Sequence, residues 1–229
     1  MPKYKQKPTI KSSITMITRD SQVERLKLSN VTYLVSSANL ANSPINQLPE
    51  IALVGRSNVG KSSVLNTICN KKKLAFTSKT PGKTRLINFF SVNIQNMEIA
   101  RLVDLPGYGY ARVNKSTKTL WNNNLSEYLL KRRNLLGFVL ILDCRHPLNK
   151  LDKQLLQIML ERNLKYHVLF NKVDKLKKNR LLTNQVTAIK ELEWLDSDFC
   201  KNGSFSNFSA QKKLGMSTLI QVFDTWLFS

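Results

Sequence analysis

The stretch Gly55–Ser62 reads GRSNVGKS and fits the pattern G-x-x-x-x-G-K-[ST]. In this pattern the glycines let the backbone curl so that successive N–H groups surround phosphate oxygens. The apolar run Ile51–Val54 precedes it and a helical pattern begins at Lys61, which is the strand–loop–helix context that the motif requires. We expect Lys61 to contact the β- and γ-phosphates and Ser62 to ligate Mg²⁺. The alternative, an ordinary glycine-containing turn, explains the spacing less well.

Two further motifs follow predicted strands. Asp104–Gly107 reads DLPG, and a carboxylate at a strand's carboxyl end can hold Mg²⁺ through a water while Gly107 N–H senses the γ-phosphate. Asn171–Asp174 reads NKVD, and an Asp carboxylate there can accept hydrogen bonds from guanine N1–H and its amine. Adenine offers neither donor, so the sequence predicts guanine selectivity. Ser209–Ala210, a weaker signal, would let backbone N–H groups approach guanine O6.

The segment between the first helix and the next strand carries three threonines, Thr77, Thr80 and Thr84. A threonine here would meet Mg²⁺ and the γ-phosphate only in the triphosphate state and so order the loop. We favour Thr84, because it lies immediately before the strand and close to the phosphates. Thr80 remains the alternative.

Short apolar runs alternate with longer segments of helical period from Ile51 onward, which indicates βα units and a mostly parallel sheet. The gap between the second and third strands is too short for a crossover helix, so these two strands should pair as an antiparallel hairpin. The expected strands are Ile51–Val54, Leu86–Val92, Glu98–Leu105, Gly137–Asp143, Tyr166–Asn171 and Ser204–Ser209. The expected helices are Lys61–Cys69, Lys118–Arg132, Lys150–Glu161, Lys178–Trp194 and Ser217–Leu227.

Composition sets limits on the class of protein. The chain has 229 residues with 36 Lys and Arg against 15 Asp and Glu, a net charge of +21, which attracts polyanions. Charge alone does not separate RNA, DNA and an anionic membrane surface, although RNA is favoured. The longest apolar stretch, residues 135–142, falls short of the roughly 18–20 residues of a bilayer span.

Domain organisation and compartment follow from simpler features. Residues 1–30 are polar and basic and are interpreted as a flexible arm, and residues 31–229 as one domain. The start of the chain has no apolar core of a secretory signal. Cys69, Cys144 and Cys200 are odd in number and far apart, so a disulfide framework is not expected and the cytoplasm is the default.

The longer stretches GRSNVGKSS, TSKTPGKTRLINFF, DLPGYGYARV and NKVD closely resemble the EngB family (also called YihA or YsxC) of bacterial ribosome-assembly GTPases, over about residues 30–229. The resemblance implies the α/β, three-layer, Ras-like P-loop GTPase fold, with helices on both faces of a mostly parallel six-stranded sheet that has one antiparallel strand. It also implies a slow GTPase that acts in maturation of the large ribosomal subunit, through its rRNA and proteins, and in normal septation and cell division. We expect a cytoplasmic monomer without stable membrane association.

The family's functional positions map onto this chain by motif. Magnesium ligation falls on Ser62 and Thr84, and catalysis on Lys61, Thr84, Gly107 and Asn58. Asn58 is also the candidate ligand for K⁺, which related GTPases hold with an asparagine at this place. Nucleotide contacts fall on Gly55, Arg56, Ser57, Asn58, Val59, Gly60, Lys61, Ser62, Gly82, Lys83, Thr84, Arg85, Leu86, Asp104, Leu105, Pro106, Gly107, Asn171, Lys172, Val173, Asp174, Phe208, Ser209 and Ala210.

Tyr108 follows the DLPG motif at the place where many GTPases carry a glutamine that orients the attacking water. Tyr108 and Tyr110 could stack on RNA or pack on a neighbouring helix. The basic clusters at residues 131–133 and 175–178 could face rRNA. The competing hypotheses are an ATP-using P-loop enzyme, and an RNA- or membrane-binding module with a largely non-catalytic nucleotide site.

Overall fold

The computed structural model describes residues 26–45, 47–75, 86–109, 118–196 and 203–229, with the backbone alone over 118–124. Its centre is a seven-stranded sheet in the order β1-β3-β4-β2-β5-β6-β7. Only β3 runs against its neighbours, pairing antiparallel with both β1 and β4. The strands are β1 (Thr32–Ser37), β2 (Glu50–Val54), β3 (Ile87–Ile94), β4 (Met97–Asp104), β5 (Leu135–Asp143), β6 (Lys165–Asn171) and β7 (Gly203–Asn207).

The six predicted strands are all present, and β3 and β4 form the expected hairpin. Its turn is made by Gln95 and Asn96, whose φ values of 50° and 63° suit the tight turns that join twisted strands. The seventh strand, β1, was predicted only as a short apolar element. It forms the edge of the sheet and only its last residue, Ser37, is buried, so its sequence lacks the buried run that marked the other strands.

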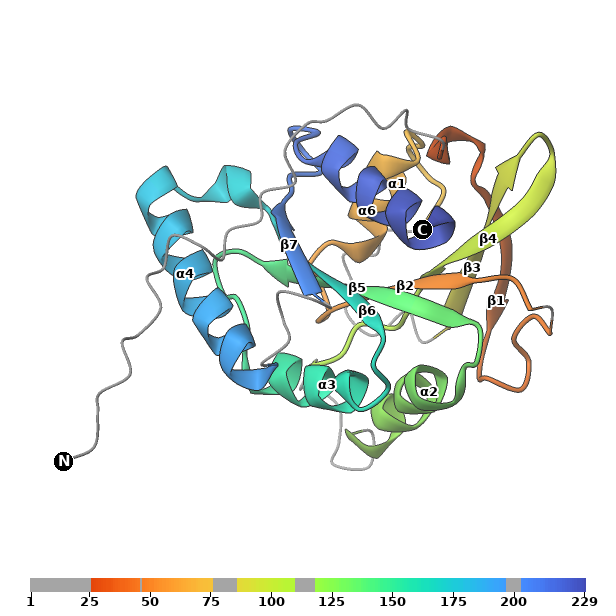
Figure 1. Cartoon of the computed structure of the whole chain (residues 1–229), viewed down its shortest axis with the longest axis horizontal. Helices are drawn as coiled ribbons and strands as arrows, with labels where there is room; N and C mark the ends of the chain where they lie inside the picture. The colour runs from red at the N-terminus through yellow and green to blue at the C-terminus, as the bar shows by residue number, and fades with distance from the viewer. Residues whose placement is uncertain (1–25, 46, 76–85, 110–117, 197–202) are drawn as a thin grey trace.

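Alternate residues of β2 point to opposite faces of the sheet, where two separate cores form. Ala52 and Val54 pack in one core with α2 (Lys118–Lys131), α3 (Lys150–Leu160) and α4 (Lys178–Leu195). Ile51 and Leu53 pack in the other core with α1 (Lys61–Ile68) and α6 (Met216–Phe228). Figure 1 shows the resulting three layers, with α1 and α6 above the sheet and α2 and α3 below it. The predicted fold class is therefore confirmed.

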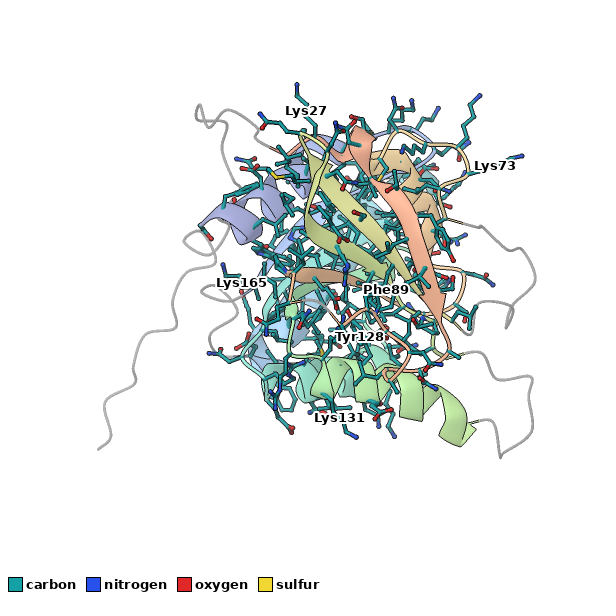
Figure 2. The ribbon with its side chains drawn as sticks, turned by 90° about the vertical axis from the view of Figure 1, so that its right-hand side faces the viewer. Lys27, Lys73, Phe89, Tyr128, Lys131 and Lys165 are labelled. Atoms are coloured by element: carbon teal, nitrogen blue, oxygen red, sulfur yellow. The ribbon has the colours of Figure 1, made fainter. Side chains whose placement is uncertain are left out.

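A buried charge network ties α2 to the sheet. Glu50 is fully buried and accepts hydrogen bonds from Tyr128 Oη at 2.7 Å and from Arg132 Nε at 2.8 Å. Arg132 also lies 5.8 Å from the ring centroid of Phe89. Figure 2 shows Phe89 and Tyr128 in the interior, whereas Lys131 projects outward. The prediction of a basic surface cluster at residues 131–133 is therefore wrong for Arg132, because its side chain pairs with buried Glu50.

The folded domain begins before residue 31. Leu26 and Leu28 are 1% and 2% exposed and pack in the core beneath α1 and α6, with a 3₁₀ turn, η2, over Leu28–Asn30. The boundary expected at residues 30/31 therefore lies too late in the chain. Along the ranges that the structure describes, no helix combines the length and apolar character needed to cross a bilayer.

Candidate functional site

Polar motifs collect where parallel strands end. β2 pairs with β4 on one side and with β5 on the other, and the chain runs from β2 to β3 on the β4 side but from β4 across β2 to β5. In such sheets ligands bind outside the carboxyl ends of the strands at this point of reversal. Val54 ends β2 immediately before the GRSNVGKS motif, Asp104 ends β4 and Asn171 ends β6, so the topology brings three separate sequence motifs to one edge.

The loop Gly55–Ser62 leaves β2 and turns into α1 through Gly60, whose φ is +103°. A Cβ atom on Gly60 would lie 2.6 Å from Asn171 Nδ2, so glycine is needed both for the turn and for the close approach. Asn171 in turn donates a hydrogen bond of 2.8 Å from Nδ2 to Val59 O. A hydrogen bond from the Asn171 side chain to the Val59 backbone therefore connects the NKVD motif to the phosphate-binding motif.

Lys61, Ser62 and Asp104 form a charged group at the base of this loop. Burial lowers the pKa of Lys61, and the charge of Asp104 opposes that effect. Burial raises the pKa of Asp104, against the Lys61 charge and the 2.9 Å hydrogen bond that Ser62 Oγ donates to Asp104 Oδ2. Among the described residues, the other carboxylate oxygen, Asp104 Oδ1, is buried and accepts no hydrogen bond. A hydroxyl beside a carboxylate oxygen with free lone pairs is an oxygen donor set that fits Mg²⁺.

Gly107 lies directly against the phosphate-binding loop. A Cβ atom there would come within 2.9 Å of Ser57 Cα and 3.0 Å of Lys61 Nζ. Ser57 N–H donates to Tyr108 O at 2.9 Å, and Ser57 Oγ donates to Gly107 O at 3.2 Å. The backbone at Gly107 and Tyr108 would therefore respond to a phosphate group bound in the loop, as the role predicted for the DLPG motif requires.

Tyr108 is turned away from the loop and packs on α3. Its side chain is 1% exposed and its hydroxyl donates a 2.7 Å hydrogen bond to Asp152 Oδ1. Arg56 Nε lies 3.4 Å from Asp152 Oδ2, so the same carboxylate also holds the phosphate-binding loop. For Tyr108 the helix-packing alternative is confirmed and RNA stacking is wrong; Tyr110 lies outside the described residues.

The NKVD motif and the segment after β7 face each other. Ser209 Oγ donates a 2.5 Å hydrogen bond to Asp174 Oδ1, and Val173 N–H donates to Phe208 O at 3.2 Å. The Ser209 hydrogen bond, with help from Lys175, holds the pKa of Asp174 below its usual range. An ionised carboxylate in this position can accept two hydrogen bonds from a guanine edge.

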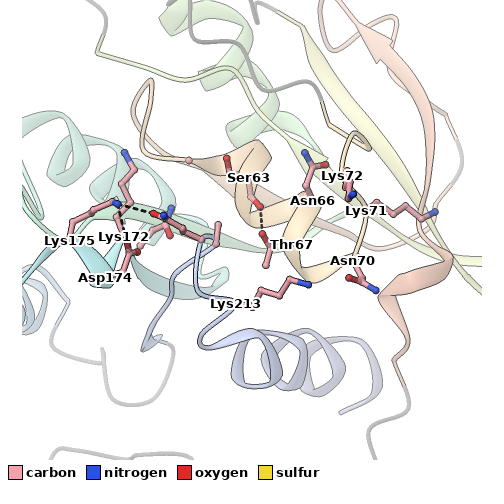
Figure 3. Close-up of a pocket in the computed structure, with 14 residues that line it drawn as sticks. Ser63, Asn66, Thr67, Asn70, Lys71, Lys72, Lys172, Asp174, Lys175 and Lys213 are labelled. Carbon is pink, nitrogen blue, oxygen red and sulfur yellow. Dashed lines mark hydrogen bonds and ion pairs between the residues drawn. The ribbon is translucent and has the colours of Figure 1, made fainter.

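A cavity of about 630 Å³ lies between α1, the NKVD motif and the segment after β7 (Figure 3). Predicted residues that line it are Gly60, Asn171, Lys172, Asp174 and Ala210. Sequence reasoning missed Ser63, Asn66, Thr67, Asn70, Lys71, Lys72, Lys175, Gln211 and Lys213. A signal existed for the first three, because their spacing along α1 puts them on the helix face that continues from Gly60.

Other predicted residues fall into three groups. The side chains of Val59, Leu105 and Phe208 are buried in the hydrophobic cores, so only their backbone could meet a nucleotide. Leu86 is 41% exposed and does not line the cavity. Outside the described residues lie Thr77, Thr80, Gly82, Lys83, Thr84 and Arg85.

Comparison with known proteins agrees with this architecture. Residues 50–172 match the family model described as "50S ribosome-binding GTPase". The chain is 42% identical over 191 residues to "Probable GTP-binding protein EngB" of Polynucleobacter asymbioticus, covering 81% of this chain and 86% of the relative. It is 43% identical over 194 residues to the protein of the same description from Salmonella paratyphi B, covering 85% and 89%.

Solved structures share the fold. The crystal structure of Aquifex aeolicus Era bound to GDP and aluminium fluoride has a TM-score of 0.63 at 22% identity, covering 80% of this chain and 58% of that one. The crystal structure of a probable GTP-binding protein EngB has a TM-score of 0.57 at 18% identity, covering 78% and 98%. The extent and identity of the sequence matches, together with the arrangement of the motifs, show that this chain belongs to the EngB family of GTP-binding proteins and is a GTPase.

Proposed function

We propose that this GTPase is a nucleotide-switched assembly factor for the large ribosomal subunit, acting in the cytoplasm and needed for normal cell division. The observation that carries the proposal is the place of Gly107 and Tyr108. They bond directly to the phosphate-binding loop, so a change at the γ-phosphate would reach Gly109, the exposed residue that follows them. The family description and the net charge of +21 favour a ribosomal RNA surface with its proteins as the partner.

In this proposal GTP lies with its phosphates on Gly55–Ser62 and its base at Asp174. Lys61 neutralises phosphate charge, and backbone N–H groups of the loop fix the β- and γ-phosphates. Ser62 would hold Mg²⁺ directly and Asp104 through a water, with Thr84 completing the set; the ion supplies further charge neutralisation to the phosphates. Gly107 N–H orients the γ-phosphate.

Unassisted hydrolysis should be slow, about 10⁻⁴ s⁻¹ or below as in other unassisted small GTPases. The reason is Tyr108, whose hydroxyl is bound to Asp152 and does not replace a water-orienting glutamine. A partner or a monovalent cation would complete the site. Asn58, an exposed residue of the loop, is the candidate K⁺ ligand, and equal turnover in KCl and NaCl at matched ionic strength would remove K⁺ from the proposal.

The test is co-sedimentation of the full chain with large ribosomal subunits in GDP, GTP and a non-hydrolysable GTP analogue. We expect binding that depends on the nucleotide and weakens steeply with salt. Binding that ignores the nucleotide would refute the switch. Stronger binding to anionic liposomes than to subunits, with Lys61→Ala leaving nucleotide affinity intact, would instead favour the alternative of a membrane- or RNA-binding module with a largely non-catalytic site.

A further inference from the structure

Asp143 lies outside every motif used so far, yet it holds a residue of the NKVD motif. It ends β5 and is paired in the sheet with Asn171 at the end of β6. Its Oδ2 atom lies 3.0 Å from Lys172 Nζ, and its side chain is 10% exposed. Arg145 approaches from the other side, with Nη2 at 2.6 Å from Oδ2 and its backbone N–H at 3.1 Å from Oδ1.

Lys172 links the two halves of the nucleotide site. Its backbone is left-handed, with φ of 64°, and its Nζ donates a 2.7 Å hydrogen bond to Asn58 O in the phosphate-binding loop. Lys172 also lines the cavity beside Asp174 (Figure 3), whereas Asp143 is not among the described residues that line it. Asp143 can therefore influence a ligand in the cavity through Lys172.

A lysine stem has many rotamers, and fixing one for a ligand costs conformational entropy at the moment of binding. A carboxylate that holds the ammonium before the ligand arrives removes part of that cost from the binding step. Asp143 is suited to this role because its backbone is fixed at the end of β5, where it pairs with Asn171 at the end of β6. Burial raises the pKa of Asp143, but the hydrogen bonds from Arg145 and Lys172 outweigh burial and keep it well below its usual range.

We propose that Asp143 is a positioning residue for guanine-nucleotide binding, which holds Lys172 so that its stem lies along the base and its ammonium ties the NKVD motif to the phosphate-binding loop. The inference rests on the proposed placement of the base at Asp174. Neither Asp143 nor the Lys172–Asn58 hydrogen bond involves the γ-phosphate. The affinity for GDP and the affinity for GTP should therefore depend equally on Asp143.

The test is a double-mutant cycle on the full chain with Asp143→Asn, Lys172→Met and the double variant. Calorimetry with GDP and with a non-hydrolysable GTP analogue should show that Asp143→Asn weakens both by roughly tenfold, the size of one lost charge-assisted hydrogen bond. KM for GTP should rise by a similar factor while kcat stays constant. In the Lys172→Met background, Asp143→Asn should have no further effect.

Arg145→Ala is the matched control. Arg145 also contacts Asp143, but its side chain is 44% exposed and water can replace it, so nucleotide affinity should change less than twofold. Thermal unfolding without nucleotide establishes that each variant is folded, and Asp143→Ser replaces Asp143→Asn if the latter is not.

Two results would overturn the inference: unchanged affinity in Asp143→Asn, or the same loss whether or not Lys172 is present. Asp174→Asn separates this failure from failure of the proposed site. If Asp174→Asn relaxes guanine selectivity while Asp143→Asn has no effect, only the role of Asp143 is refuted. If Asp174→Asn leaves selectivity unchanged, the placement of the base is wrong and the inference falls with it.

Discussion

Acidification should destabilise this protein in part through His167, a side chain that sits inside the sheet on β6. His167 is 0% exposed, and its ring nitrogens lie 2.8 Å from Ser204 Oγ and 2.8 Å from Ser206 Oγ on β7. Both serine hydroxyls can adapt to a neutral imidazole, but no carboxylate among the described residues contacts the ring to balance a charged one. Burial therefore lowers the pKa of His167 to about 3.

Acid destabilises the folded state because the pKa of His167 is lower in the folded protein than in the unfolded chain. The folded state keeps His167 neutral, whereas the unfolded chain takes up a proton below its ordinary pKa of about 6.5. Stability is thus unaffected above that pH and falls as the pH drops from about 6.5 towards about 3. Between pH 7.5 and pH 5.0 the loss from this one group is about 2 kcal/mol, or about 4–8 °C in Tm for a domain of this size.

The assay is urea unfolding at a series of pH values, comparing wild type with His167→Gln. His167→Gln removes the titrating group, so its unfolding free energy should fall less on acidification by about 2 kcal/mol over this interval. His146→Gln is the matched control, because His146 is the other histidine of the chain and is exposed. Parallel pH curves for wild type and His167→Gln would refute the reasoning.

Two further predictions concern buried hydrogen bonds, each with an exposed counterpart as control. Tyr108→Phe leaves the buried carboxylate of Asp152 without its 2.7 Å donor and should cost about 1–3 kcal/mol in thermal unfolding, whereas Tyr33→Phe, whose hydroxyl bond is exposed, should cost little. An equal effect of the two would contradict the prediction. Glu50→Gln breaks a fully buried ion-pair network and should cost about 3–5 kcal/mol, whereas Glu127→Gln, in an exposed pair, should cost less than about 1 kcal/mol. If chemical denaturation showed only a small loss of unfolding free energy in Glu50→Gln, the network would not stabilise the fold.

The sequence was sufficient for the parts of the fold that have a strong local signal. Strand β5 is a continuous apolar run and α3 carries a helical period, so both were predicted within a few residues. β1 was not predicted as a strand, because an edge strand with exposed side chains lacks the apolar pattern of a buried strand. Arg132 was misplaced because only the tertiary structure shows that Glu50, far away in sequence, draws it into the core.

The same division holds for the site. Motifs with fixed spacing gave the phosphate-binding loop and the NKVD residues, because local chain geometry places their side chains. Asp143 and Asp152 were not predicted as site residues, because a single aspartate at a strand end or in a first helical turn has many roles. Their importance comes from contacts across the sheet edge with Lys172, Arg56 and Tyr108, which sequence spacing does not encode.

The central claim is that the carboxylate of Asp174, held by Ser209, selects guanine in a cavity shared with the phosphate-binding loop. Isothermal titration calorimetry of the folded protein with GDP and ADP tests it most directly, with Asp174→Asn measured in parallel against GDP and xanthosine diphosphate. We expect wild type to prefer GDP over ADP by at least about a hundredfold, because adenine offers the Asp174 carboxylate neither of the two donors that guanine offers. Asp174→Asn should shift the preference to the xanthine nucleotide. Equal affinity of wild type for GDP and ADP would contradict the account.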